Sequence, residues 1–286
     1  MADREILGTL VRLAFAEGIR RRVFAVVGAL SVLFVVLYGL AANLAFEEVS
    51  VLDAVALIEE RTIVGATMTG LAMFATLFLA AVLVTFMTMG AIRGHADAGL
   101  LAPIAVRPVP RSALLIAPWL AATIVGGAYV LTLFASITVL TWALGGWVPD
   151  RPILAGLALV GAVAVLAALS VSLSVWLRAS ATGIAVLMVY GAGLTAGLLG
   201  QIGQGLNIDR LERAGEVVAW ALPFEALYQA ALSALTADTG GLTGLALSLG
   251  PFGGPQSAGP ELGVWAVVYI AAVLALASRF LRRSDL

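Results

Sequence analysis

The chain has 286 residues, of which 62% are hydrophobic and 12% charged, and its mean hydropathy is +1.06. A soluble domain is nearer half apolar and a quarter charged, so this composition excludes an ordinary soluble protein. The formal net charge of −1 gives no sign of a nucleic-acid-binding protein. The chain has no cysteine, which excludes disulfides and thiolate metal sites.

The first predicted element is an amphipathic interfacial helix over residues 1–22. In Arg4–Arg22 apolar side chains recur at helical spacing on one side, while Glu5, Arg12 and Arg20 fall on the other. This pattern is typical of a helix that lies in the membrane interface with its arginines near anionic headgroups. The alternative is a plain charged leader to the first span.

Six uncharged blocks are long enough, or nearly so, to cross a bilayer as one helix each, which takes about 20 residues. Lipid permits only helices or closed barrels, and the strand alternation of a barrel is absent. The sequence therefore predicts an all-α polytopic membrane protein, with a six-helix transmembrane domain over residues 23–286. The six blocks are Val23–Phe46, Thr62–Ile92, Ser112–Pro149, Pro152–Leu177, Ala179–Ile208 and Leu262–Ser278.

The arginines predict the orientation. The chain has sixteen basic residues, all of them arginine, and with the N-terminus inside only Arg61, Arg151, Arg210 and Arg213 fall outside. This bias matches the positive-inside rule for six helices with both termini cytoplasmic, and we expect a multi-pass protein of the bacterial inner membrane. The apolar run after the first basic cluster is longer than a typical signal-peptide core, so a retained anchor is expected.

Residues 201–261, between spans five and six, form the one large predicted extracytoplasmic element. Within it, the apolar segment Trp220–Ala237 is interrupted by Pro223 and Glu225. We expect two helices that dip into or lie on the outer leaflet, followed by a Gly/Pro-rich loop; the alternative, a soluble lobe, fits poorly with such apolar residues. Glu225 is expected to face water or a cluster of backbone amides, because an unpaired carboxylate in lipid is costly.

Several kinds of chemistry are missing from the sequence. The apolar cores of the predicted spans contain no charged residue and no histidine, which argues against a proton- or sodium-driven carrier. One histidine and no cysteine make a histidine-based catalytic site hard to build, and no catalytic residue or metal ligand set is predicted. An ATP-binding P-loop needs a lysine, and the chain has none, so the chain is not expected to be an enzyme by itself.

Two weaker features concern the spans themselves. Gly193 and Gly197 form a GxxxG pattern in the fifth span, which would allow close helix approach across a dimer; packing within the chain is the alternative. The second span holds a group of methionines, for which core or lipid-facing packing is favoured over a soft-metal site or an adaptable substrate surface. These methionines are Met68, Met73, Met87 and Met89.

The cytoplasmic segment 93–112 separates two long uncharged blocks and holds the only histidine. A short helix is predicted from His95 to Leu101, and the prolines that follow it stop the helix and stiffen its exit. A short, half-polar helix of this kind is suited to docking on a soluble protein and pushing on two spans. The alternative is a solvated turn whose arginines follow the positive-inside rule.

This segment resembles the coupling region of the type-2 ABC exporter permeases, in the pattern Gly94-x-x-x-x-Gly99-x-Leu101 and then Pro108-x-x-Arg111-x-x-Leu114-Leu115. The layout of an interfacial helix, six spans and an extracytoplasmic broken helical hairpin between spans five and six is also similar to that family, in its type V exporter-like form. Within the family, the chain most resembles multicopper-enzyme and nitrous-oxide-reductase maturation permeases. It departs from the family where His95 replaces a frequent Glu and Pro118 a frequent Lys.

The resemblance implies a permease subunit that moves or extracts a substrate, as a homodimer or with a related permease, driven by two copies of an ABC ATPase subunit that bind ATP and Mg. An extracytoplasmic accessory protein is a further expected partner. It implies ATPase-coupling residues His95, Asp97, Gly99, Leu100, Leu101, Arg107, Pro108 and Arg111. It implies extracytoplasmic gate residues Pro223, Phe224, Glu225 and Tyr228. The substrate stays open among lipid, peptide, drug, polysaccharide and a metal-related sulfur species; the alternative function is a non-transporting membrane scaffold or sensor subunit.

Overall fold

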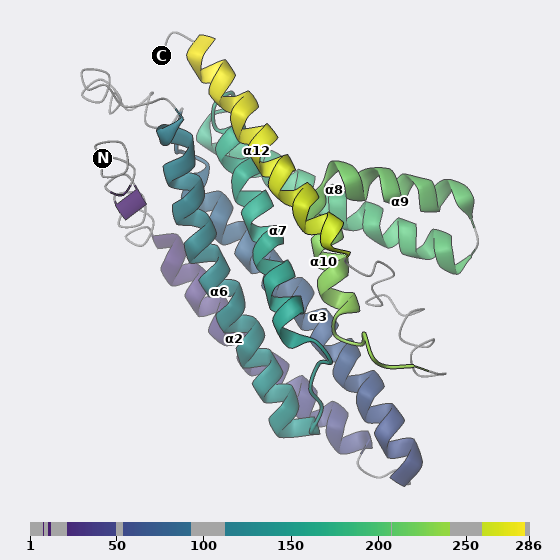
Figure 1. The fold of residues 1–286 in the computed structure, drawn as a ribbon. Coiled ribbons are helices and arrows are strands. Elements are labelled where there is room, and N and C mark those ends of the chain that lie inside the picture. Colours follow the sequence, from purple (N-terminus) through teal and green to yellow (C-terminus); the bar gives the residue numbers. More distant parts are fainter. Residues whose placement is uncertain are drawn as a thin grey trace.

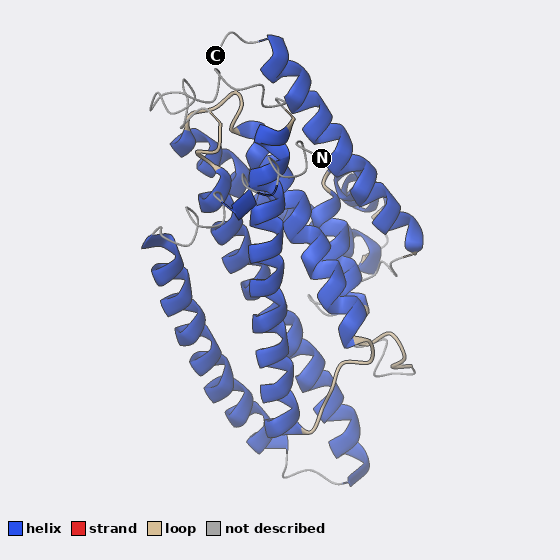
Figure 2. Cartoon of the chain, turned by 60° about the vertical axis from the view of Figure 1, so that its left-hand side comes forward, coloured by secondary structure: helices blue, strands red, loops and turns tan. Residues whose placement is uncertain are grey.

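The computed structural model describes residues 8, 11–12, 22–49, 54–92, 112–206, 208–240 and 259–283. These stretches are helical with no strand among them, as Figures 1 and 2 show, which confirms the predicted all-α class. The helices are α2 (Arg22–Val49), α3 (Ala54–Thr88), α6 (Ala113–Gly145), α7 (Pro152–Leu173), α8 (Ala179–Gly205), α9 (Asp209–Ala221), α10 (Pro223–Ser233) and α12 (Pro260–Arg283).

Six of these helices are long and apolar enough to cross a membrane, and they coincide with the six predicted blocks. They are α2, α3, α6, α7, α8 and α12, so the chain is a multi-pass membrane protein. The start of α3 differs from the predicted block, because α3 begins at Ala54 and not at Thr62. The extra two turns carry Glu59, Glu60 and Arg61, which are good helix formers and continue the helix beyond the apolar block.

The end of α6 also differs from the predicted block, which ran on to Pro149. Gly146 adopts a left-handed backbone with φ of 68°, and its N–H donates to the carbonyl of Trp142 at 2.8 Å. This is a glycine helix cap, a conformation that other residues adopt only with strain. The residues after it form the loop to α7, which begins with Pro152 in its first turn.

Helix α7 is the centre of the bundle, and α3, α6, α10 and α12 all pack against it. Most of its side chains are buried, whereas few side chains of α2 and α12 are buried and many of their apolar ones are exposed. An exposed apolar face on a spanning helix suits contact with lipid, so these two helices lie at the outside of the single chain. Among the methionines of α3, Met73 is buried in the main core, which agrees with the favoured packing role.

Glycines let several pairs of helices approach one another closely. Gly126 of α6 faces Val84 and Val163, so that α6 lies close to both α3 and α7. At the other side of the molecule a side-chain carbon on Gly215 of α9 would lie 2.6 Å from the Cα of Gly200 in α8, so these two backbones touch. The α8–α9 hairpin extends to one side of the bundle in Figure 1.

Candidate functional site

The first candidate site is built around α10, which follows α9 after a break at Leu222. Leu222 has φ of −129° and ψ of 76°, and Pro223 then starts a new helix because its missing N–H is harmless in a first turn. Every residue from Pro223 to Leu232 is buried. The prediction of two helices in this region is therefore confirmed. They were expected either to dip into the outer leaflet or to lie on it, and α10 is buried among the spans instead of lying on their surface.

The GxxxG pattern of α8 faces α10 of the same chain. A side-chain carbon on Gly193 would lie 2.5 Å from the ring of Phe224, and the carboxyl group of Glu225 occupies the space beside Gly197. Both glycines are buried in the single chain. The assignment of these glycines to a dimer interface is therefore corrected, and the alternative of packing within the chain holds. Two residue sets that looked unrelated in the sequence form one α8–α10 interface.

A chain of polar side chains crosses this interface. The amide nitrogen of Gln201 in α8 donates to the amide oxygen of Gln229 in α10 at 2.6 Å. The amide nitrogen of Gln229 in turn donates to the carboxyl oxygen Oε1 of Glu225 at 2.8 Å. Gln229 lies one helical turn after Glu225, so both side chains project from the same face of α10.

Among the residues that the structure describes, Glu225 is the one buried acidic side chain, with 2% of its surface exposed. Burial raises the pKa of Glu225 to about 7, and the hydrogen bond from Gln229 lowers the pKa by a smaller amount. The expectation that Glu225 faces water or backbone amides is therefore wrong. The physical reason is that the side-chain amide of Gln229, one turn further along, supplies the hydrogen-bond donor in the interior.

Aromatic side chains surround the same interface. The rings of Tyr190 in α8 and Phe224 in α10 stack with centroids 5.8 Å apart. The hydroxyl groups of Tyr190 and Tyr228 are buried, and neither has a hydrogen-bond partner among the described residues. The carbonyl oxygen Oε1 of the Gln201 side chain is in the same state. Buried polar atoms usually find a partner, so this group of unsatisfied atoms is unusual for an apolar bundle.

The end of α10 is tied to the loop between α6 and α7. The N–H groups of Asp150 and Arg151 donate to the carbonyls of Leu235 and Ala234, each at 3.0 Å. These bonds lie just beyond the C-terminus of α10, where helix carbonyls lack partners within the helix. The loop thus fixes the exit of α10 through the backbone.

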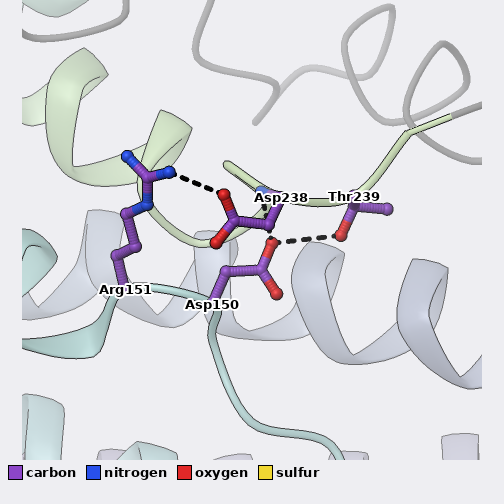
Figure 3. Close-up of polar contacts among 4 residues, drawn as sticks. All are labelled: Asp150, Arg151, Asp238 and Thr239. Carbon is purple, nitrogen blue, oxygen red and sulfur yellow. Dashed lines mark hydrogen bonds and ion pairs between the residues drawn. The ribbon is translucent and has the colours of Figure 1, made fainter.

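Side chains reinforce this attachment, and Figure 3 shows the four residues involved. Arg151 Nη2 lies 2.6 Å from Asp238 Oδ1, and Asp150 Oδ2 accepts from the N–H of Asp238 at 2.8 Å. The hydroxyl of Thr239 lies 3.2 Å from the same oxygen of Asp150. Asp238 raises the pKa of Arg151 through its hydrogen bond and its charge. We call these four residues the loop clamp.

A second candidate region lies at the opposite end of the bundle, where α3 ends and α6 begins. Buried side chains from α6, α7, α12 and the turns that follow α3 and α7 meet there, and we call this group the loop-base cluster. Its members are Ile92, Leu115, Val171, Val175, Ala277 and Leu281. Ile92 and Leu115, which flank the segment between α3 and α6, therefore lie in one apolar cluster with residues of α7 and α12.

Several predicted residues lie outside the described residues. These are all eight ATPase-coupling residues, namely His95, Asp97, Gly99, Leu100, Leu101, Arg107, Pro108 and Arg111. The predicted interfacial helix over residues 1–22 and the predicted Gly/Pro loop lie mostly outside them too. In the part of the chain that the structure describes, no group of three or more His, Cys, Asp or Glu side chains is placed to hold a metal ion.

The four predicted gate residues, in contrast, lie within the described part of the chain, and all are buried in α10. They are Pro223, Phe224, Glu225 and Tyr228. Sequence reasoning missed Gln229 and Gln201. The spacing of four between Glu225 and Gln229 was a usable signal for the first of them. Comparison of the chain with protein-family models and with curated proteins found no match.

Proposed function

We propose that the chain is the transmembrane permease subunit of an ABC transporter, which moves a substrate across the membrane or extracts it from the membrane. The observation that carries the proposal is α10, a short helix buried against the spans α7, α8 and α12. Polar contacts join it to α8 and, just beyond its C-terminus, to the loop between α6 and α7. Interrupted helices inside a membrane domain leave backbone and side-chain groups available to a substrate, whereas a plain scaffold has no need of one.

The energy source in this proposal is a separate subunit. The chain has no lysine for the phosphates of ATP, so ATP and Mg bind in two copies of a partner ATPase. The permease works as a homodimer or with a related permease, in the bacterial inner membrane with both termini in the cytoplasm. An extracytoplasmic accessory protein is a further partner on the side of α10.

The proposed mechanism links the two ends of the bundle. The ATPase grips segment 93–112, whose coupling helix includes Leu100 and Leu101. Movement of this segment passes through Ile92 and Leu115 of the loop-base cluster into α3, α6, α7 and α12. Because α10 packs against α7 and α12, the same movement opens or closes the extracytoplasmic side.

The test changes two residues of the proposed coupling helix and no residue of the membrane spans. Leu100→Asp/Leu101→Asp is expected to abolish co-purification of the ATPase, or to uncouple its activity, since burial of two leucines contributes about 3–6 kcal/mol before the costs of association. The control is Leu206→Asp/Ile208→Asp, at exposed apolar positions that follow the spanning part of α8 and precede α9. Undiminished binding and coupled ATP hydrolysis in the Leu100/Leu101 variant contradict the proposed coupling role.

The scaffold or sensor alternative makes a different prediction for the same preparation. The complex would then hold no ATP-hydrolysing subunit, and no ATPase gene would accompany this one. Orientation is tested separately with single cysteines, because the chain has none of its own. Ala237→Cys should react with an impermeant thiol reagent in intact cells, and Ser284→Cys should react only after the cells are opened; the reverse result contradicts the orientation.

A further inference from the structure

A carboxyl group buried among membrane spans needs either a cation or a proton to neutralise it. Glu225 has a neutral amide, that of Gln229, as its hydrogen-bond partner. The side chain also fills the space beside the Cα of Gly197, so water has no room between the carboxyl group and α8 at that point. An ionised carboxylate without a compensating charge is strongly disfavoured in such a place.

The elements packed against α10 supply no compensating charge at this point. α7 has no titratable residue. α8 contributes Tyr190, α10 itself adds Tyr228 and α12 adds Tyr269, and these tyrosines are neutral at physiological pH. Every charged residue of α9 and α12 whose side chain the structure describes is exposed. These exposed residues are Asp209, Arg210, Arg213, Glu216, Glu261 and Arg279.

The orientation of Gln229 favours a proton over a metal ion. Its amide oxygen accepts the hydrogen bond from Gln201, so its amide nitrogen is the atom that points at Glu225. A metal ion beside the carboxyl group would therefore meet an N–H donor instead of an oxygen ligand. A protonated carboxyl group accepts that N–H bond and carries no net charge.

We propose that Glu225 is a proton-binding site that controls whether α10 is packed against α8. With the proton bound, Glu225 lies against Gly197 and the α8–α10 interface is closed. When the proton leaves to extracytoplasmic water, the carboxylate follows toward water, α10 rotates about the break at Leu222, and the interface opens. The raised pKa of Glu225 agrees with this and places the change near neutral pH.

This inference goes beyond the proposed function, since its test needs neither an ATPase nor a substrate. The reporter is Ala231→Cys, at a buried position of α10, and its rate of reaction with a maleimide is measured in purified protein at about pH 5.5 and about pH 8.5. Thiol ionisation also changes over this range, so each rate is divided by that of Ala237→Cys, at an exposed position beyond α10.

With Glu225 present, the normalised rate should rise about tenfold or more from the lower to the higher pH, following the ionised fraction. With Glu225→Gln, which keeps the shape of the protonated form, the rate should stay low at both pH values. Gly197→Ala places a methyl group where the carboxyl group lies and should give a high rate at both, whereas Gly191→Ala, with open space at its Cα, should behave as the parent.

Three results overturn the proposal. One is an equal pH dependence in the parent and in Glu225→Gln, and another is a flat rate in both. The third is protection at about pH 8.5 by sodium or potassium chloride but not by choline chloride, which would assign the site to a metal ion. Each variant is first checked for a single monodisperse species, and if Gly197→Ala fails that check, the comparison of Glu225 with Glu225→Gln still decides the question.

Discussion

Two of the glycine contacts between helices in this bundle have partners of different kinds. At Gly126 of α6 the neighbours are the valine side chains Val84 and Val163, and at Gly197 of α8 the neighbour is the carboxyl group of Glu225. The first contact has the same free energy at any pH. The second depends on whether Glu225 is neutral. Close helix packing, which is usually independent of pH, therefore becomes pH-dependent when one of the packed groups can titrate.

The contact between Glu225 and Gly197 should make the free energy of unfolding depend on pH, and this is the greatest change we expect. Because the pKa of Glu225 in the folded chain is raised from 4.5 to about 7, the protein binds this proton more tightly than the unfolded chain does. The stabilisation is complete below about pH 4.5 and is lost as the pH rises through about 7. At higher pH, Glu225→Gln should be more stable than the parent by up to about 3 kcal/mol, with little difference at about pH 4.5.

This difference is measured as the midpoint of thermal unfolding in detergent across the pH range. The control is Glu216→Gln, an exposed glutamate of α9, which should leave the pH profile of the parent unchanged. If Glu225→Gln loses stability with rising pH as steeply as the parent does, the burial of Glu225 has no consequence for the folded state.

The contact of Gly126 with Val84 and Val163 should, in contrast, be independent of pH. In Gly126→Ala the new methyl group would lie 2.7 Å from Cγ1 of Val163 and also too close to Val84, and β-branched side chains have few rotamers to move to. We expect a loss of about 2 kcal/mol, the usual range for overpacking, and the same loss at every pH. Gly28→Ala, with open space at its Cα in α2, is the matched control.

The spans could be predicted from the sequence because length and hydropathy decide them, and α2, α3, α6, α7, α8 and α12 all fell in the expected blocks. The location of α10 could not. Its Pro223, Glu225 and Gln229 lower the hydropathy of the segment, which suggests an exposed helix. The polar side chains of Glu225 and Gln229 are instead hydrogen-bonded to each other and to Gln201 of α8.

The partners of a site residue were harder to foresee than the residue itself. Gly197 and Glu225 were both singled out, in separate roles, and nothing in the local pattern joins them, because α9 intervenes in the sequence. The same holds for Asp150 and Asp238, which lie 88 residues apart and meet only when the end of α10 reaches the loop between α6 and α7. Tertiary packing of helices creates these pairs, and periodicity within one helix does not report it.

The smallest expected effect concerns the loop clamp, which holds the far end of α10. Arg151 and Asp238 are 53% and 61% exposed, and exposed ion pairs contribute about 0–1 kcal/mol and weaken with salt. Asp150 has a different role, since its carboxylate accepts a backbone N–H and a hydroxyl hydrogen bond at the same time. Asp150→Ala should therefore cost about 1 kcal/mol, more than Arg151→Ala, because it removes two hydrogen bonds at once.

The Ala231→Cys reporter measures this effect as the normalised rate of maleimide reaction at low pH, where Glu225 is protonated. Arg151→Ala should raise the rate less than Asp150→Ala does, and its effect should vanish in high salt, because screening already removes the ion pair in the parent. Thr239→Val removes the hydroxyl hydrogen bond alone, so it should raise the normalised rate less than Asp150→Ala does. An Arg151→Ala effect that exceeds that of Asp150→Ala and persists in high salt would show that the ion pair, and not the backbone attachment, holds the end of α10.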